Sequence, residues 1–158
     1  MTEIANIVDE AKKAYEGKAW HGPALMELLA DISAAQAAAK PLPTAHSIWE
    51  IVLHIAGWQG VASRRVKGEA VAEPMFGDWP AVNDKSPAAW ARALATLAGA
   101  QEELIKTIST LPESALQQTA AGTDETGSVV DYSVYSTLHG VIQHTLYHAG
   151  QIALLKRA

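Results

Sequence analysis

The sequence predicts an all-α protein, a four-helix bundle with a long crossover connection. Three observations lead to this fold class. Four long segments carry apolar residues at steps of three and four, the spacing of one helix face. No segment shows a convincing run of the alternation that marks a half-buried strand. The chain has 158 residues, 49% of them apolar, enough to bury a core of its own, so we expect a single domain over residues 1–158.

The first predicted helix covers residues 3–15, where apolar side chains recur at helical spacing. Gly17 follows it and favours a helix end. Two short helical segments are expected next, one over residues 24–29 and one over residues 33–39. The Pro-Leu-Pro run at residues 41–43 then prevents the helix from continuing.

The second long helix is expected over residues 46–68. Ser47 and Glu50 have the spacing of a capping box, which places the start of this helix at Ser47. The third helix opens at Ser86-Pro87, where serine suits the cap and proline the first turn. Pro112 ends it.

Residues 69–85 are rich in turn formers and form a connection longer than most in helical bundles. This segment is therefore the candidate crossover, or a wall of a site. A second polar stretch covers residues 117–128 and is expected to be irregular. The last helix is predicted over residues 133–156, with one apolar stripe along its length.

Composition excludes several classes of function. The chain has no cysteine, so disulfides, thiolate metal sites and cysteine nucleophiles are ruled out. Its net charge is -5, and its one basic cluster, residues 64–67, is too short for a phosphate-binding patch, so no nucleic-acid partner is expected. No apolar run approaches the about 20 residues of a membrane helix. The first residues lack a signal-peptide pattern, and we expect a cytoplasmic protein without membrane contact.

Histidines are the residues that point to chemistry. Of the six in the chain, His144 and His148 lie four residues apart on the last predicted helix and face the same way. His148 falls on the apolar stripe of that helix, where a polar side chain needs a partner. Neutral imidazole is a common metal ligand, and two histidines one turn apart can share an ion.

His54 is the third candidate ligand, at the edge of the apolar face of the second long helix. Three imidazoles from two helices would leave coordination positions open for water or substrate, as in catalytic metal sites. The spacing fits equally well with core histidines that hydrogen-bond to one another or to carbonyl groups.

Three further residues are candidates for orienting a ligand or lining a pocket. Gln151 follows His148 by three residues, and Trp58 follows His54 by one turn. His21 lies in a break between helices. The sequence contains no G-x-S-x-G and no H-E-x-x-H, so it lacks the usual signatures of serine hydrolases and zinc proteases.

The last helix resembles the C-terminal signature of the DinB-like (DinB/YfiT-like) superfamily, in which H-x-x-x-H precedes A/R-G-Q-I. Here the run is His144-Thr-Leu-Tyr-His148, followed by Ala-Gly-Gln-Ile. Residues 46–56 are similar to the other signature of that superfamily, a helix that carries the first metal histidine, and residues 20–23, Trp-His-Gly-Pro, resemble one of its branches. The resemblance covers essentially the whole chain.

The resemblance implies a four-helix bundle with a long crossover and a site for one divalent ion (Zn, Ni, Mn or Fe) at His54, His144 and His148. Members of the superfamily often pair as dimers, so the resemblance also implies a homodimer. Some relatives are metal-dependent transferases or isomerases that use a low-molecular-weight thiol, and others are classed as hydrolases, which implies a small-molecule substrate. We therefore expect a metal-dependent enzyme of the thiol S-transferase or hydrolase type. The alternative is a non-catalytic metal-binding or stress-response protein.

Overall fold

The computed structural model describes residues 1–124 and 126–158. Within these ranges the protein is all-α, and its only strand-like pairings are two isolated β-bridges, Thr119 with Ser133 and Thr123 with Val129. The helices are α1 (Glu3–Glu16), α2 (Leu25–Leu29), α3 (Ala34–Ala38), α4 (Ile48–Val66), α5 (Pro87–Ser109), the 3-10 helix η1 (Glu113–Gln117) and α6 (Val134–Leu155).

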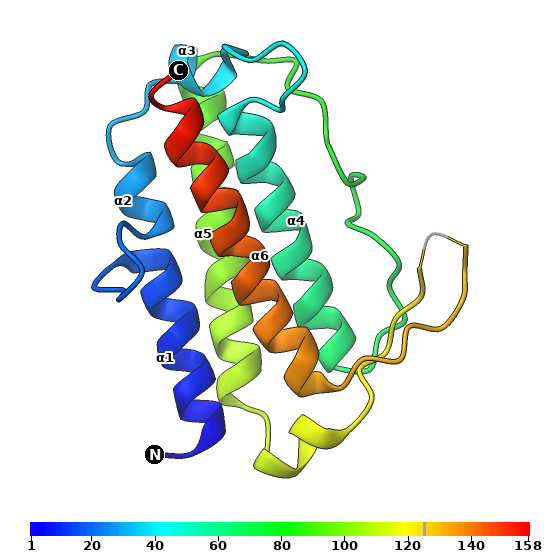
Figure 1. The fold of residues 1–158 in the computed structure, drawn as a ribbon. Coiled ribbons are helices and arrows are strands. Elements are labelled where there is room, and N and C mark those ends of the chain that lie inside the picture. The colour runs from blue at the N-terminus through cyan, green and yellow to red at the C-terminus, as the bar shows by residue number, and fades with distance from the viewer. Residues whose placement is uncertain (125) are drawn as a thin grey trace.

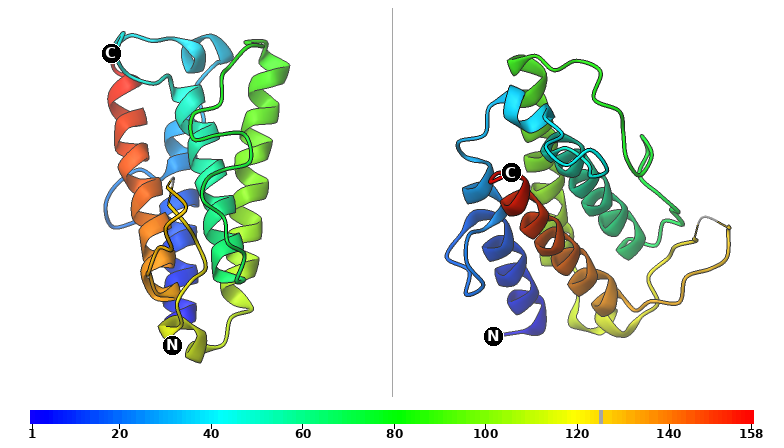
Figure 2. Two further views of the ribbon diagram at one scale, coloured as in Figure 1. Left: turned by 90° about the vertical axis from the view of Figure 1, so that its right-hand side faces the viewer. Right: turned by 45° about the horizontal axis from the view of Figure 1, so that its top comes forward.

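The four long helices, α1, α4, α5 and α6, lie side by side (Figures 1 and 2). Helix α4 packs against α5 and α6, and α1 packs against the same two helices. The segment 69–85 runs back along the outside of α4 to the start of α5, so that α4 and α5 point in the same direction (Figure 1). This segment therefore covers the side of α4 that carries the site described below.

The predicted helix starts are confirmed at atomic detail. The Ser47 hydroxyl accepts a hydrogen bond from the Glu50 backbone N–H, and the Glu50 carboxylate accepts one from the Ser47 N–H at 2.7 Å, which completes the capping box of α4. At the start of α5 the Ser86 hydroxyl accepts a hydrogen bond from the Ala89 backbone N–H, and Pro87 lies in the first turn. These caps satisfy backbone donors that the first turn of a helix leaves free.

The apolar faces meet in two clusters, and a layer of polar side chains lies between them. One cluster gathers the C-terminal part of α6 with the N-terminal parts of α4 and α5, and the other gathers the opposite ends with α1. Between them, Gln59 donates a hydrogen bond to Gln101 at 2.8 Å, and Thr145 and His148 are buried nearby along α6. The helix stripes predicted from the sequence thus converge on a core with a polar middle.

Two features between α5 and α6 do not follow from periodicity. Residues 113–117 form the 3-10 helix η1, whose Glu113 carboxylate accepts a hydrogen bond from the Ile4 N–H at the start of α1. The two β-bridges then join parts of the following polar stretch.

None of the helices in the described parts of the chain has the length and apolarity needed to cross a membrane.

Candidate metal centre

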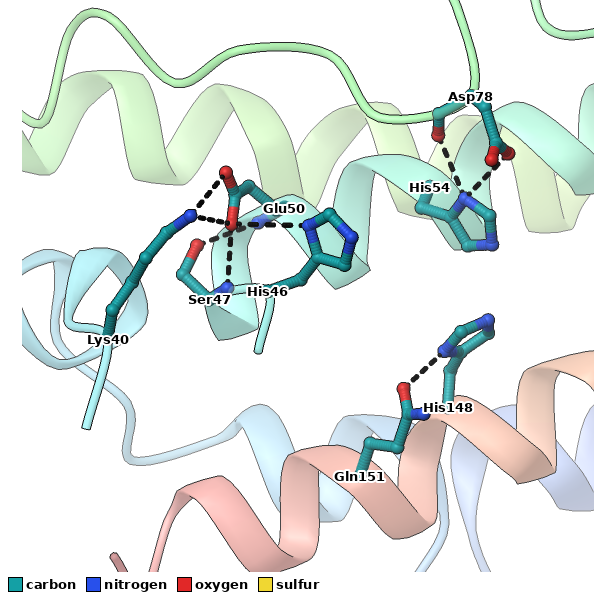
Figure 3. A network of polar contacts seen from close by, with 8 residues as sticks. All are labelled: Lys40, His46, Ser47, Glu50, His54, Asp78, His148 and Gln151. Carbon is teal, nitrogen blue, oxygen red and sulfur yellow. Dashed lines mark hydrogen bonds and ion pairs between the residues drawn. The ribbon is translucent and has the colours of Figure 1, made fainter. Parts of the chain in front are cut away.

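Helices α4 and α6 bring three histidines together in the polar middle of the protein. The Nε2 atom of His144 lies 2.9 Å from Nε2 of His54 and 3.1 Å from Nε2 of His148. His54 and His148 are each 5% exposed, and His144 is partly buried. In Figure 3, His54 and His148 extend toward each other from facing helices. The structure thus places all three predicted histidines in one cluster.

Hydrogen bonds on the outer side of the cluster select the tautomer of two imidazoles. The Nδ1–H of His54 donates to the Asp78 backbone carbonyl at 2.8 Å, and the Asp78 carboxylate lies 3.1 Å from the same nitrogen. The Nδ1–H of His148 donates to the Gln151 side-chain oxygen at 2.6 Å. A neutral imidazole carries one proton, so Nε2 of both His54 and His148 presents a lone pair to the centre.

This arrangement leaves the cluster with more acceptors than donors. Two lone pairs, on His54 and His148, face Nε2 of His144, which can offer at most one proton. The Nδ1 atom of His144 is buried and has no hydrogen-bond partner in the described chain. A divalent cation would satisfy all three Nε2 atoms, because two nitrogens bound to one ion at about 2.0–2.1 Å lie about 2.9–3.4 Å apart. The residues present therefore fit a metal ion.

Burial keeps His144 and His148 neutral. The pKa of His144 falls to about 4, first because burial penalises the charged form and then because positive charge on His148 and His54 repels it. Burial also lowers the pKa of His148, against the opposing effect of its hydrogen bond to Gln151. Neutral imidazole is the form that binds metals, so His144 and His148 are ready to act as ligands at neutral pH.

The segment 69–85 forms a wall over His54. Trp79 stacks on the His54 ring, with centroids 3.8 Å apart and planes 4° from parallel, and it stacks on His46 on its other side at 3.5 Å. Asp78 accepts a hydrogen bond from the Trp58 indole N–H at 2.7 Å while it faces His54. Figure 3 shows Asp78 directly above His54. The segment thus orients His54 and links it to Trp58.

Two separate cavities border the cluster. One, of about 420 Å³, lies between α4 and α6 and is lined by Trp58 and His144. The other, of about 350 Å³, is lined by Trp79, His148 and Gln151. Both histidines of α6 therefore border space large enough for a small molecule.

The other predicted residues differ in where they lie. Gln151 accepts a hydrogen bond from His148, and Trp58 lines the larger cavity and donates to Asp78. His21 lies exposed in the turn between α1 and α2, and the structure does not bring it to the cluster. His139 turns toward α1, where its ring lies 3.5 Å from the Glu10 carboxylate.

Sequence reasoning missed Asp78, Trp79 and the stacking of His46. The run Gly77-Asp78-Trp79-Pro80 carries only the signal of a turn, and nothing in it indicates which helix it covers. A tryptophan and an aspartate inside an unusually long connection are the one available hint of a site wall.

Comparison with known proteins agrees with the geometry. No curated protein and no solved structure matches the chain. The family model of the DinB superfamily matches residues 19–152, a range that includes all three clustered histidines and the segment above His54. The chain therefore belongs to the DinB superfamily.

Proposed function

We propose that this protein is a metal-dependent enzyme that binds one divalent ion through His54, His144 and His148, in a DinB-type four-helix bundle whose crossover is the segment 69–85. The observation that carries the proposal is the convergence of three Nε2 atoms, two of which present lone pairs because their Nδ1–H groups donate outward. A hydrogen-bonded core cluster would not gather this excess of acceptors.

The protein residues would hold and orient the ion. The Asp78 carbonyl and the Gln151 side chain keep His54 and His148 in the tautomers that expose Nε2, the role that outer hydrogen-bond partners have in metal sites. When bound, the ion supplies a Lewis acid that lowers the pKa of a thiol or water and so creates a nucleophile near neutral pH. Three protein ligands leave room for that group, and the two cavities beside His144 and His148 leave room for a substrate.

Thiol transfer is the reaction type that we favour, with hydrolysis as the other candidate. The chain has no cysteine, so a thiol nucleophile would come from a small molecule that enters the site. The substrate-sized cavities support a catalytic function over a purely metal-binding one, because a structural site is normally closed by four protein ligands. Three neutral nitrogen ligands do not select among Zn, Ni, Mn and Fe.

Metal content per chain tests the site. Wild-type protein, purified without an affinity-tag metal column and reconstituted with divalent ions, is expected to hold about one equivalent, because three neutral imidazoles form one coordination face. His54→Ala should hold much less. His139→Ala is the matched control, since His139 belongs to α6 but faces α1, and it should keep full occupancy. Equal metal content in wild type and His54→Ala would refute the proposed ligands.

Cobalt substitution separates the two reaction types. If the open position takes a thiolate, adding a small thiol such as 2-mercaptoethanol to the cobalt-loaded protein should produce a thiolate-to-cobalt absorption band. The band should be absent in His54→Ala, which cannot hold the ion. If the cobalt-loaded wild type shows no such band, hydrolysis becomes the favoured reaction type.

A further inference from the structure

Arg65 closes one end of the cavity that begins at His144. It lines this cavity from α4, about two turns beyond Trp58. Its Nε–H donates to the Val71 carbonyl at 2.8 Å, and its Nη2 donates to the carbonyls of Ala72 and Thr123 at 2.8 and 3.1 Å. The guanidinium is thereby fixed between α4 and two connecting segments.

The fit around this guanidinium is close. A Cβ atom placed on Gly122 would lie 2.8 Å from the Arg65 Nε, so no side chain other than hydrogen fits there unless the arginine moves. Arg65 also accepts the Ala121 N–H with its own backbone carbonyl. A guanidinium positioned this rigidly loses little further freedom when it binds a ligand.

In the described parts of the chain, the charge of Arg65 has no acidic partner. Within residues 1–124 and 126–158, no carboxylate lies in ion-pair range of Arg65, whereas its neighbour Arg64 pairs with Glu69 at 2.7 Å. Neutral carbonyls occupy Nε and Nη2, and in the same described ranges Nη1 has no hydrogen-bond partner. One positive charge and one set of donors therefore remain for a ligand.

The rest of the cavity is mainly apolar. Val61 and Ala62 of α4 face Gly140 and Val141 of α6 across it. Along α6 the lining runs from His144 to Ser136, eight residues, or about 12 Å of helix. The cavity thus has a histidine end, an apolar middle and a cationic end.

We propose that this cavity is the binding site of an elongated small molecule with an apolar body and a carboxylate, whose carboxylate binds Arg65 and whose other end reaches the histidine cluster. A single guanidinium without other cations suits a monoanion, and the apolar walls suit a hydrocarbon or aromatic body. The placement of the reacting end rests on the proposed function, but the binding of the carboxylate does not.

Calorimetric titration of metal-free protein with octanoate and with 1-octanol tests the proposal. The protein is kept metal-free so that octanoate cannot coordinate an ion. Weaker octanoate binding in a variant then reports on the cavity and not on loss of metal. Octanoate should bind wild type about tenfold or more tightly than octanol, because a charge-assisted hydrogen bond distinguishes them. Arg65→Met should remove this preference, while Arg64→Met, on the exposed neighbour, should retain it. Equal binding of the two probes to wild type would overturn the proposal.

A second variant locates the binding site independently of Arg65. A Cβ on Gly140 would meet no atom within 4 Å, so Gly140→Leu can fill the cavity without disturbing α6. It should abolish the binding of both probes. Gly150→Leu, also on α6 and also open, lies outside this cavity and should bind octanoate as wild type does. Unchanged octanoate binding in Gly140→Leu would place the probe elsewhere and overturn the proposal.

Discussion

Asp78 shows how one residue from a connecting segment sets the chemistry of a helix residue. Its backbone carbonyl and its carboxylate both face Nδ1 of His54, while the carboxylate also takes the Trp58 indole N–H. In the neutral ring, His54 then directs a lone pair toward His144 and His148. The ability of His54 to bind a metal through Nε2 therefore depends on Asp78 as well as on the histidine itself.

Asp78→Asn should weaken metal binding about tenfold, because the carboxylate that holds the His54 ring in place through its Nδ1 atom becomes a neutral amide. Competition against a chromophoric chelator measures the effect. Glu73→Gln is the matched control, since it removes one negative charge from the same segment without touching a histidine. If both variants lost the same affinity, the effect of Asp78 would be one of net charge and not of orientation.

The histidines also predict how the stability of the metal-free protein depends on pH. The folded-state pKa of His144 is about 4, below the ordinary 6.5, so the unfolded chain binds more protons between these values. The contribution of His144 to the free energy of unfolding should therefore be fully present above pH 6.5, and the free energy of unfolding should fall as the pH drops toward 4. Urea denaturation at a series of pH values checks this, and His144→Gln should flatten the slope. An unchanged slope in that variant would remove His144 as the cause.

The histidines themselves could be predicted from spacing and from their position on apolar stripes, because a helix fixes which residues share a face. Asp78 and Trp79 could not. They reach His54 through a connection without periodicity, and its path depends on packing between Pro74 and α4 that no local pattern encodes. His21 shows the opposite error. Its local sequence suggested a residue of the site, but it lies exposed in a turn away from the cluster.

At the scale of elements, one close contact sets how near the segment 69–85 approaches α4. A Cβ atom on Gly57 would lie 2.9 Å from the Pro74 side chain, whereas one on Gly60 would meet nothing within 4 Å. Gly57 stands one turn after the cluster residue His54, and Pro74 precedes Asp78 by four residues in the segment. The missing side chain at Gly57 therefore lets the wall come close enough to hold His54.

Gly57→Ala should destabilise the protein by about 1–3 kcal/mol, through overpacking against Pro74, and should weaken metal binding by displacing Asp78. Gly60→Ala, on the same helix but facing open space, should be neutral or stabilising by up to about 1 kcal/mol, since alanine is the better helix former. Urea denaturation and a chelator competition measure both. Similar stability of the two variants would show that residues 69–85 can move away from α4 without cost, and that the contact between Gly57 and Pro74 does not set their distance.

The long helices and their caps were predictable because each depends on residues close in sequence: Ser47 with Glu50 for α4, and Ser86 with Pro87 for α5. The 3-10 helix η1 was not, because five residues are too few to show a period. It is stabilised partly from afar, by the bond between Glu113 and Ile4 at the start of α1. Elements made by long-range contacts are those that local patterns miss.

At the scale of the whole molecule, we expect the fold to form without an ion at the histidine cluster. Two apolar clusters lie on either side of the polar middle layer, and each joins several helices without a histidine. The ion would bind a framework that is already formed, in contrast to small domains that fold only around their metal.

Removing the metal with a chelator should therefore leave the far-UV circular dichroism unchanged and lower Tm by roughly 5–10 °C. This size follows from about 2.7 kcal/mol of stabilisation at a ligand concentration one hundred times Kd, in a protein of this length. His54→Ala should show the lower Tm with or without chelator. Loss of the helical signal on chelation would make the site a structural one.

The most direct test of the metal centre is X-ray absorption spectroscopy at the edge of the bound metal, on loaded wild type and on His54→Ala. The three-histidine site predicts a wild-type spectrum with nitrogen ligands at about 2.0–2.1 Å for zinc and the outer-shell scattering of three imidazoles, and a spectrum with fewer imidazoles in the variant, if it retains any ion. A wild-type shell of oxygen ligands, or a spectrum unchanged by His54→Ala, would contradict the assignment of His54, His144 and His148 as the metal ligands.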